Sequence, residues 1–391
     1  MGFGHKQNII SHQSISSKSS AIFGTKKYPG SQLVKHVRKS MISSVRGAPR
    51  QKTLLVTFDA FSTLFHPRRP VPEQYASIAH SYGLSSSLVT PSRLDAAFRV
   101  AFKAQNKRLP NYGREEALRG WYGGPRQWWG DVVRESFMRL VQGKDGNDDS
   151  RLQAQISLAL SKGMVEEVVD RSASREGYAL YDDVTPLFQR LRTWRMDGPK
   201  RGAARPFDRI IVGVVSNSDD RISAVLESLG LNVGAVRADQ DKRSMELPGF
   251  EERRDKTTPS RGSLRVQENS NIDMIITSYE AGGEKPDKLI FDVAKRQAHR
   301  FVCGSDDAMS PAEQACMVTK HLDSSDWVCM HVGDDYEKDY RGAINAGWSS
   351  RLLLREPPNL DHQPGSPQDA AVIQTLDELI PELEKDIEIH E

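Results

Sequence analysis

Residues 54–65 read LLVTFDAFSTLF, and this stretch decides how the rest of the chain is interpreted. The apolar residues on either side of Thr57 form the short continuous run that is typical of a strand buried in a parallel sheet. Asp59 ends the run, and the hydroxyls of Ser62 and Thr63 that follow can hydrogen-bond it and the turn after it. Open α/β sheets bind their ligands just beyond the carboxyl ends of the strands. Asp59 is therefore a candidate nucleophile, although an Asp that merely ends a strand gives the same local pattern.

Composition indicates a globular protein with room for an inserted subdomain. The chain has 391 residues, of which 38% are apolar, enough for one large core or two modest ones. No apolar stretch approaches the roughly 18 residues that cross a bilayer, so we expect no membrane association. The three cysteines, an odd number without close CxxC spacing, favour free thiols in a reducing compartment.

The charge is distributed unevenly. Ten Lys or Arg residues and no Asp or Glu lie before Asp59, and the remaining 44 basic and 52 acidic residues give the body a net charge of −8. Residues 1–52 thus form a basic, Ser-rich leader, which predicts a mitochondrial transit peptide. A disordered tail on a cytoplasmic or nuclear protein, or translation from Met41 instead of Met1, are the alternatives. The acidic body argues against nucleic-acid binding.

Helical periodicity replaces the strand pattern over residues 68–180. We interpret this region as a helical insertion into a core made of residues 53–67 and 181–391. An aromatic and glycine-rich patch lies within it, at residues 110–113 and 121–129. Rigid rings on turns could form a substrate-binding lip, but they could equally pack among the helices of the insertion.

Three further apolar runs predict core strands at residues 210–215, 274–277 and 327–332. Polar residues follow each of them, namely Ser216 and Asn217, then Lys285, then Asp334, Asp335 and Asp339. Residues 239–272 lack apolar periodicity, so we expect a disordered insertion there. A closing amphipathic helix is expected over residues 370–387. Acidic residues grouped at a strand end need a compensating cation or Lys, and their oxygen atoms suit Mg²⁺.

Taken together, the four strand ends resemble the haloacid dehalogenase-like (HAD) hydrolase superfamily. Its motifs are a nucleophilic Asp, a Ser or Thr, a Lys and an acidic pair, in the order in which Asp59, Ser216, Lys285 and Asp334 occur here. The resemblance covers about residues 54–383 without the inserted loops. It implies an α/β fold, in which a Rossmann-like parallel sheet core carries an inserted α-helical cap subdomain.

The resemblance also implies roles for individual residues. Asp59 would attack a small phosphomonoester to give an aspartyl-phosphate, with Lys285 as the second catalytic residue. Thr63, Ser216, Asn217 and Lys285 would bind the phosphoryl group. Mg²⁺ would be held by Asp59, the backbone carbonyl of Phe61, Asp334 and Asp339. A small phosphorylated molecule is thus the expected partner.

Phe61 departs from the family's pattern. The phosphatases of the family carry a general acid two residues after the nucleophile, and its loss typically costs about 10²- to 10⁴-fold in rate. The sequence therefore leaves three functions open. The chain could be a slow or specialised Mg²⁺-dependent phosphohydrolase, a pseudoenzyme that binds a phosphorylated metabolite or partner, or a 2-haloacid dehalogenase, whose leaving group needs no proton.

Overall fold

The computed structural model describes residues 52–141, 149–196, 206–238, 270–303, 326–355 and 369–384. The expected leader, apart from Lys52, lies outside the described residues, and so does most of the expected insertion, residues 239–269. Among the described helices, none is long and apolar enough to cross a membrane.

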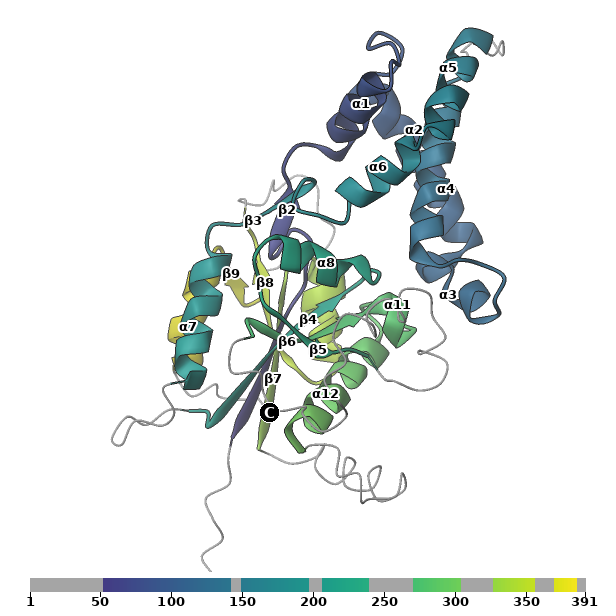
Figure 1. The fold of residues 1–391 in the computed structure, drawn as a ribbon. Coiled ribbons are helices and arrows are strands. Elements are labelled where there is room, and N and C mark those ends of the chain that lie inside the picture. Colours follow the sequence, from purple (N-terminus) through teal and green to yellow (C-terminus); the bar gives the residue numbers. More distant parts are fainter. Residues whose placement is uncertain are drawn as a thin grey trace, which may run out of the picture. The chain divides into compact units, whose positions relative to one another are not determined.

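A seven-stranded sheet forms the core, in the order β5-β6-β4-β1-β7-β8-β9 (Figure 1). Every neighbouring pair in this sheet is parallel. The strands are β1 (Thr53–Phe58), β4 (Arg209–Ser216), β5 (Val233–Val236), β6 (Ile272–Thr277), β7 (Trp327–Gly333), β8 (Ser349–Leu353) and β9 (Val372–Ile373). The predicted Rossmann-like α/β fold with its helical cap is confirmed.

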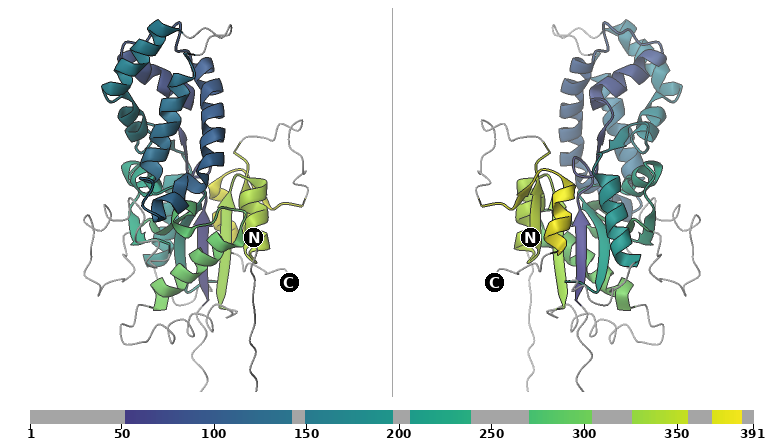
Figure 2. Two further views of the ribbon diagram at one scale, coloured as in Figure 1. Left: turned by 90° about the vertical axis from the view of Figure 1, so that its right-hand side faces the viewer. Right: turned by 90° about the vertical axis from the view of Figure 1, so that its left-hand side faces the viewer.

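Strand β1 is central because side chains on both of its faces are buried. Leu54, Val56 and Phe58 pack into one hydrophobic cluster, with α7 (Val184–Met196) and α15 (Leu379–Glu384). Leu55 points the other way and packs with α12 (Lys288–Cys303). Helices therefore cover both faces of the sheet (Figure 2). The core also contains shorter helices. They are α8 (Arg221–Ser228), α11 (Ser278–Ala281), the π-helix η1 (Tyr336–Arg341), α14 (Gly342–Asn345) and the 3₁₀ turn η2 (Leu376–Glu378).

The helical insertion is joined to the core through an antiparallel pair of short strands, β2 (Phe65–Pro67) and β3 (Tyr178–Leu180). We call the six helices that the structure describes between them the cap. They are α1 (Val71–Ser81), α2 (Pro91–Arg108), α3 (Pro110–Leu118), α4 (Pro125–Met138), α5 (Ser150–Ser161) and α6 (Met164–Arg171). The cap has an apolar cluster of its own, which includes Leu94, Phe137 and Ile156.

Two expectations about the core need correction. The helix expected over residues 370–387 is wrong at its start, because Val372 and Ile373 pair with Leu352 and Leu353 as strand β9. The end of the expected insertion, residues 270–272, is also ordered. Ser270 is buried and donates a hydrogen bond to Asp273 Oδ1 at 2.7 Å, so that β6 begins at Ile272.

Candidate active site

Asp59 lies directly beyond β1, at the carboxyl edge of the sheet. Its backbone N–H donates to the carbonyl of Val332 at 2.8 Å, which fixes it beside the end of β7. Ser62 then adopts a left-handed φ of 57°, and the chain turns away from the sheet. The position therefore follows from the parallel register of β1 and β7.

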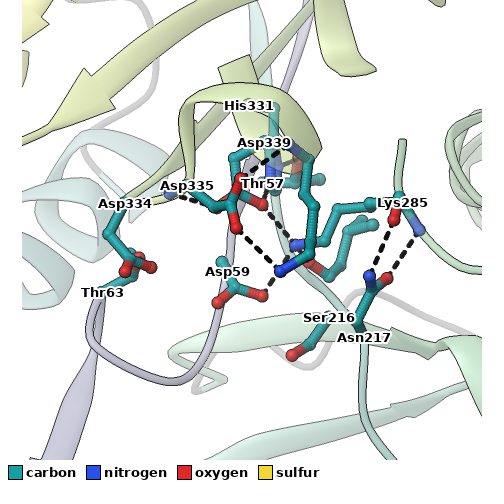
Figure 3. A network of polar contacts seen from close by, with 12 residues as sticks. Thr57, Asp59, Thr63, Ser216, Asn217, Lys285, His331, Asp334, Asp335 and Asp339 are labelled. Carbon is teal, nitrogen blue, oxygen red and sulfur yellow. Dashed lines mark hydrogen bonds and ion pairs between the residues drawn. The ribbon is translucent and has the colours of Figure 1, made fainter. Parts of the chain in front are cut away.

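Lys285 is the cation of the site (Figure 3). Its Nζ donates to Asp59 Oδ1 at 2.7 Å, to the Val215 carbonyl at 2.8 Å and to Asp339 Oδ1 at 2.5 Å. Burial would lower the pKa of Lys285, but the carboxylates of Asp339 and Asp59 outweigh it and hold that pKa above its ordinary value. Lys285 is therefore a permanent positive charge between two carboxylates that are far apart in the sequence.

Asn217 holds the backbone of Lys285 from both sides. Its Oδ1 accepts from the Lys285 N–H at 2.6 Å, and its Nδ2 donates to the Lys285 carbonyl at 2.8 Å. The carboxamide thus orients the lysine. Ser216, the last residue of β4, is buried immediately before it, and the close-up shows both residues on the same side of the site as Lys285 (Figure 3).

Three carboxylates meet at this edge. One oxygen each from Asp59, Asp334 and Asp339 lies within 4.8 Å of the others. Burial and the repulsion of Asp59 and Asp339 raise the pKa of Asp334 to about 7. Burial also raises the pKa of Asp59, against the opposing charge of Lys285. A cluster of hard oxygen ligands in which one carboxyl resists ionisation fits a divalent cation such as Mg²⁺.

Asp334 and Asp335 are adjacent in the chain but have different contacts. Thr63 Oγ1 donates to Asp334 Oδ1 at 3.3 Å, so Thr63 touches the cluster of carboxylates. Asp335 points away and caps η1, where its Oδ1 accepts from the N–H of Lys338 at 2.9 Å. At Gly333 a Cβ atom would come within 2.3 Å of Asp339 Cγ. Only glycine therefore lets Asp339 approach the end of β7.

Asp339 is held by a buried chain of hydrogen bonds through His331 and Thr57, which the sequence analysis did not identify. His331 Nε2 lies 3.2 Å from Asp339 Oδ1, and its Nδ1 lies 2.9 Å from Thr57 Oγ1. Burial lowers the pKa of His331, which favours the neutral ring with Nε2 donating to Asp339. Burial alone would raise the pKa of Asp339, but Lys285 and His331 hold it well below its ordinary value. The only sequence signal was a pair of polar residues inside apolar strands.

Phe61 lies two residues after Asp59 in the chain and is surrounded by aromatic rings. Its ring centroid lies 4.7 Å from that of Phe65 and 5.5 Å from that of Tyr178, both at edge-to-face angles. Phe65 and Tyr178 belong to β2 and β3, the connection between core and cap. The role of the Phe61 carbonyl as a metal ligand stays a prediction.

The aromatic patch packs within the cap and also contacts the core, and its use as a substrate-binding lip stays a prediction. Trp128 is fully buried within the cap, whereas Trp129 Nε1 donates to Asp219 Oδ2 at 2.7 Å in the loop after β4. Arg221 lies over the Trp129 ring, with 4.6 Å from its Cζ to the ring centroid. The Tyr112 hydroxyl donates to the Asn217 carbonyl at 3.3 Å. The cap thus contacts the loop that orients Lys285.

Comparisons with known proteins are consistent with this geometry. No family model matches the chain. Human haloacid dehalogenase-like hydrolase domain-containing protein 3 is 27% identical over 307 residues, which cover 78% of this chain and 84% of that protein. An uncharacterised hydrolase of Schizosaccharomyces pombe is 25% identical over 300 residues, 77% of this chain and 90% of that protein.

Among solved structures, a HAD phosphatase from Thermococcus onnurineus aligns with a TM-score of 0.38 and 16% identity, over 86% of this chain and all of that one. The mouse counterpart of the human protein is 27% identical over 339 residues, 86% of this chain and 96% of that protein. The human and mouse proteins align with this chain over most of their own length and over most of the length of this chain. Over most of its length, the chain is similar to haloacid dehalogenase-like hydrolases.

Proposed function

We propose that this protein is a Mg²⁺-dependent phosphohydrolase that acts on a small phosphorylated molecule through Asp59. The observation that carries the proposal is the asymmetric environment of the Asp59 carboxylate. Oδ1 accepts from Lys285 at 2.7 Å, and no side chain or backbone group of the described residues hydrogen-bonds to Oδ2. Lys285 therefore favours the anion while leaving one oxygen free to attack.

The proposed reaction has two steps. Asp59 Oδ2 forms a bond to phosphorus while the bond from phosphorus to the leaving oxygen breaks, which gives an aspartyl-phosphate. Water then attacks this intermediate, releasing phosphate and restoring the carboxylate. Lys285 Nζ, the Ser216 hydroxyl and the Thr63 hydroxyl are the groups we propose for binding phosphoryl oxygens, and Asn217 fixes the lysine that does so.

The metal site of the proposal consists of Asp59, Asp334, Asp339 and the Phe61 carbonyl. When bound, Mg²⁺ would supply positive charge that offsets the repulsion between the anionic nucleophile and an anionic substrate. Of these ligands, Asp339 already accepts hydrogen bonds at both oxygens, because its Oδ2 receives the Asp335 N–H at 2.9 Å. Asp59 and Asp334 therefore have the more available oxygen atoms.

Phosphate release from a panel of phosphorylated compounds tests the proposal. We expect turnover in the wild type with Mg²⁺, and its loss with EDTA and in Asp59→Asn. Asp292→Asn is the matched control, since Asp292 makes a solvent-exposed pair with Lys288 on α12. Turnover that survives in Asp59→Asn would exclude Asp59 as the nucleophile.

Because Phe61 replaces an acid, the same experiment should also test for a dehalogenase and for a binding protein without activity. A 2-haloacid dehalogenase would release halide from 2-chloropropionate with EDTA present. A binding protein without activity would be stabilised against heat by phosphate compounds and would turn over none of them.

A further inference from the structure

Among the described residues, the ring contacts of Phe61 include no carboxyl or imidazole group. We use aromatic wall for Phe61, Phe65 and Tyr178, whose ring centroids lie 4.7 to 5.5 Å apart. Phe61 stands two residues after the nucleophile, on the loop that carries Asp59. Phe65 is fully buried and Tyr178 is 7% exposed, so both rings brace Phe61.

The two charged groups that act on the Tyr178 phenol, Arg221 and Asp219, pair with each other, and Lys285 is also committed to other partners. Lys285 donates to three acceptors. Arg221 binds Asp219 with two nitrogens, Nε at 2.9 Å and Nη2 at 3.0 Å. Among the ring contacts of Phe61 in the described chain, Tyr178 alone carries an ionisable group, and burial raises the pKa of its phenol. A carboxylic acid or imidazole, which exchanges protons readily near neutral pH, is missing from these contacts.

We infer that the substrate is a phosphate carried on an acidic hydroxyl, namely an aryl or acyl phosphate with an apolar leaving group. The inference rests on the proposed function and adds the class of substrate. When Asp59 Oδ2 bonds to phosphorus, the electron pair of the breaking bond stays on the leaving oxygen, which departs as a phenolate or carboxylate without taking up a proton. An alkyl alcohol cannot leave in this way, because its alkoxide is far too basic.

The aromatic wall also favours an apolar leaving group over a sugar or a polyphosphate. Aromatic side chains bind other rings and apolar groups through edge-to-face and offset contacts. The phenyl edge of Phe61 offers no hydrogen bond to a sugar hydroxyl and no positive charge to a second phosphate. The same residue thus restricts both the acidity and the polarity of the leaving group.

A second consequence concerns the intermediate. The family's general acid also activates water in the second step, as the resemblance implies, and Phe61 cannot do so. With an acidic leaving group, formation of the aspartyl-phosphate is fast and its hydrolysis is slow. The intermediate therefore accumulates, which gives a burst of leaving group before steady turnover.

A series of substituted phenyl phosphates, extended with alkyl phosphates, tests this inference. In the wild type, kcat/KM is expected to fall steeply as the pKa of the leaving group rises. Phe61→Asp is expected to flatten that dependence by restoring about 10²- to 10⁴-fold for alkyl phosphates. Phe61→Leu, which removes the ring without adding an acid, is the control and should keep the steep dependence. Mass spectrometry of the acid-quenched wild type should find one phosphoryl group on the peptide that contains Asp59.

The outcomes separate this inference from the proposed function. A shallow dependence in the wild type would overturn the inference, and so would a dependence that becomes steeper in Tyr178→Phe, because Tyr178 would then be the proton donor. Release of phosphate from alkyl and aryl compounds at equal rates would leave the phosphohydrolase standing without this substrate class. Failure to cleave even the most acidic aryl phosphate, with no phosphoryl group on Asp59, would overturn the proposed function itself.

Discussion

The loop after β1 joins two different environments, a charged one around Asp59 and an apolar one around Phe61, two residues further on. In the first, which we call the charged side, Lys285, Asp339 and His331 form a buried network of charged and polar groups, with Asp334 beside them. In the second, the apolar side, Phe61 and its neighbouring rings form an apolar wall. The charged side has what is needed to orient a nucleophile and bind an anion. The described ring contacts of Phe61 include no carboxyl or imidazole group that could transfer a proton near neutral pH. The groups that orient the nucleophile and the group that donates a proton are thus separate parts of such a site. The first can be present where the second is missing.

Removing Lys285 is the largest change that can be made to the charged side. Lys285→Met would leave Asp59 and Asp339 buried without their shared cation, which is expected to cost about 3–5 kcal/mol of unfolding free energy. Urea unfolding measures this loss, and the phosphatase assay should show no turnover. Lys288→Met is the control because the Lys288 side chain is 57% exposed, so about 0–1 kcal/mol is expected there. Equal losses in the two variants would show that Lys285 is not the central charge of the network.

Mg²⁺ should stabilise the charged side, because it relieves the repulsion among Asp59, Asp334 and Asp339. At a Mg²⁺ concentration about 100 times the Kd, mass action predicts roughly 2.7 kcal/mol of added stability. Asp334→Asn should abolish the rise in melting temperature that Mg²⁺ causes. Asp335→Asn is a control at the adjacent position and should keep the rise, since the oxygens of Asp335 contact η1. Loss of the effect in both variants would contradict the separation of their roles.

The sequence predicted the charged side better than the apolar one, for a physical reason. Buried parallel strands are continuous apolar runs, so their ends can be located. Asp59 and Asp334 lie directly beyond such ends, and Lys285 lies in the loop that follows β6 and α11. The contact of Phe61 with Tyr178 joins residues more than a hundred positions apart in the chain. It depends on the pairing of β2 with β3, two short strands that carry no strong pattern.

The same reason explains what was missed in the core. Thr57 and His331 could be placed in strands, but their hydrogen bond requires the register in which they face each other across β1 and β7. Strand β9 has two residues, and only its pairing with β8 distinguishes it from the start of a helix. The hydrogen bond and strand β9 both depend on how strands pair in the folded sheet. The local sequence pattern does not contain that information.

His331 tests whether the charged side depends on its buried chain of hydrogen bonds. His331→Leu would remove one donor to Asp339 and leave the Thr57 hydroxyl with the Met330 carbonyl as its partner at 3.3 Å. An unsatisfied buried polar group costs about 1–3 kcal/mol, so a loss in that range is expected in chemical unfolding. His331→Gln, whose amide can still donate to Asp339, should lose less stability and more of the activity should remain. Identical behaviour of the two variants would mean that the volume of His331 matters and its hydrogen bond does not.

The smallest expected effect is at the cap, which contacts the charged side through the loop after β4. Trp129→Phe removes the hydrogen bond to Asp219 while keeping a ring beneath Arg221. Since Asp219 retains its pair with Arg221, the loss should be about 1 kcal/mol or less. KM is expected to rise a few-fold with little change in kcat, because cap contacts position the loop without entering the chemistry. Trp121→Phe is the control, since Trp121 is 76% exposed. A fall in kcat with unchanged KM in Trp129→Phe would instead show that the cap contact affects the chemical step. The rate would then depend on the cap as well as on the environments of Asp59 and Phe61.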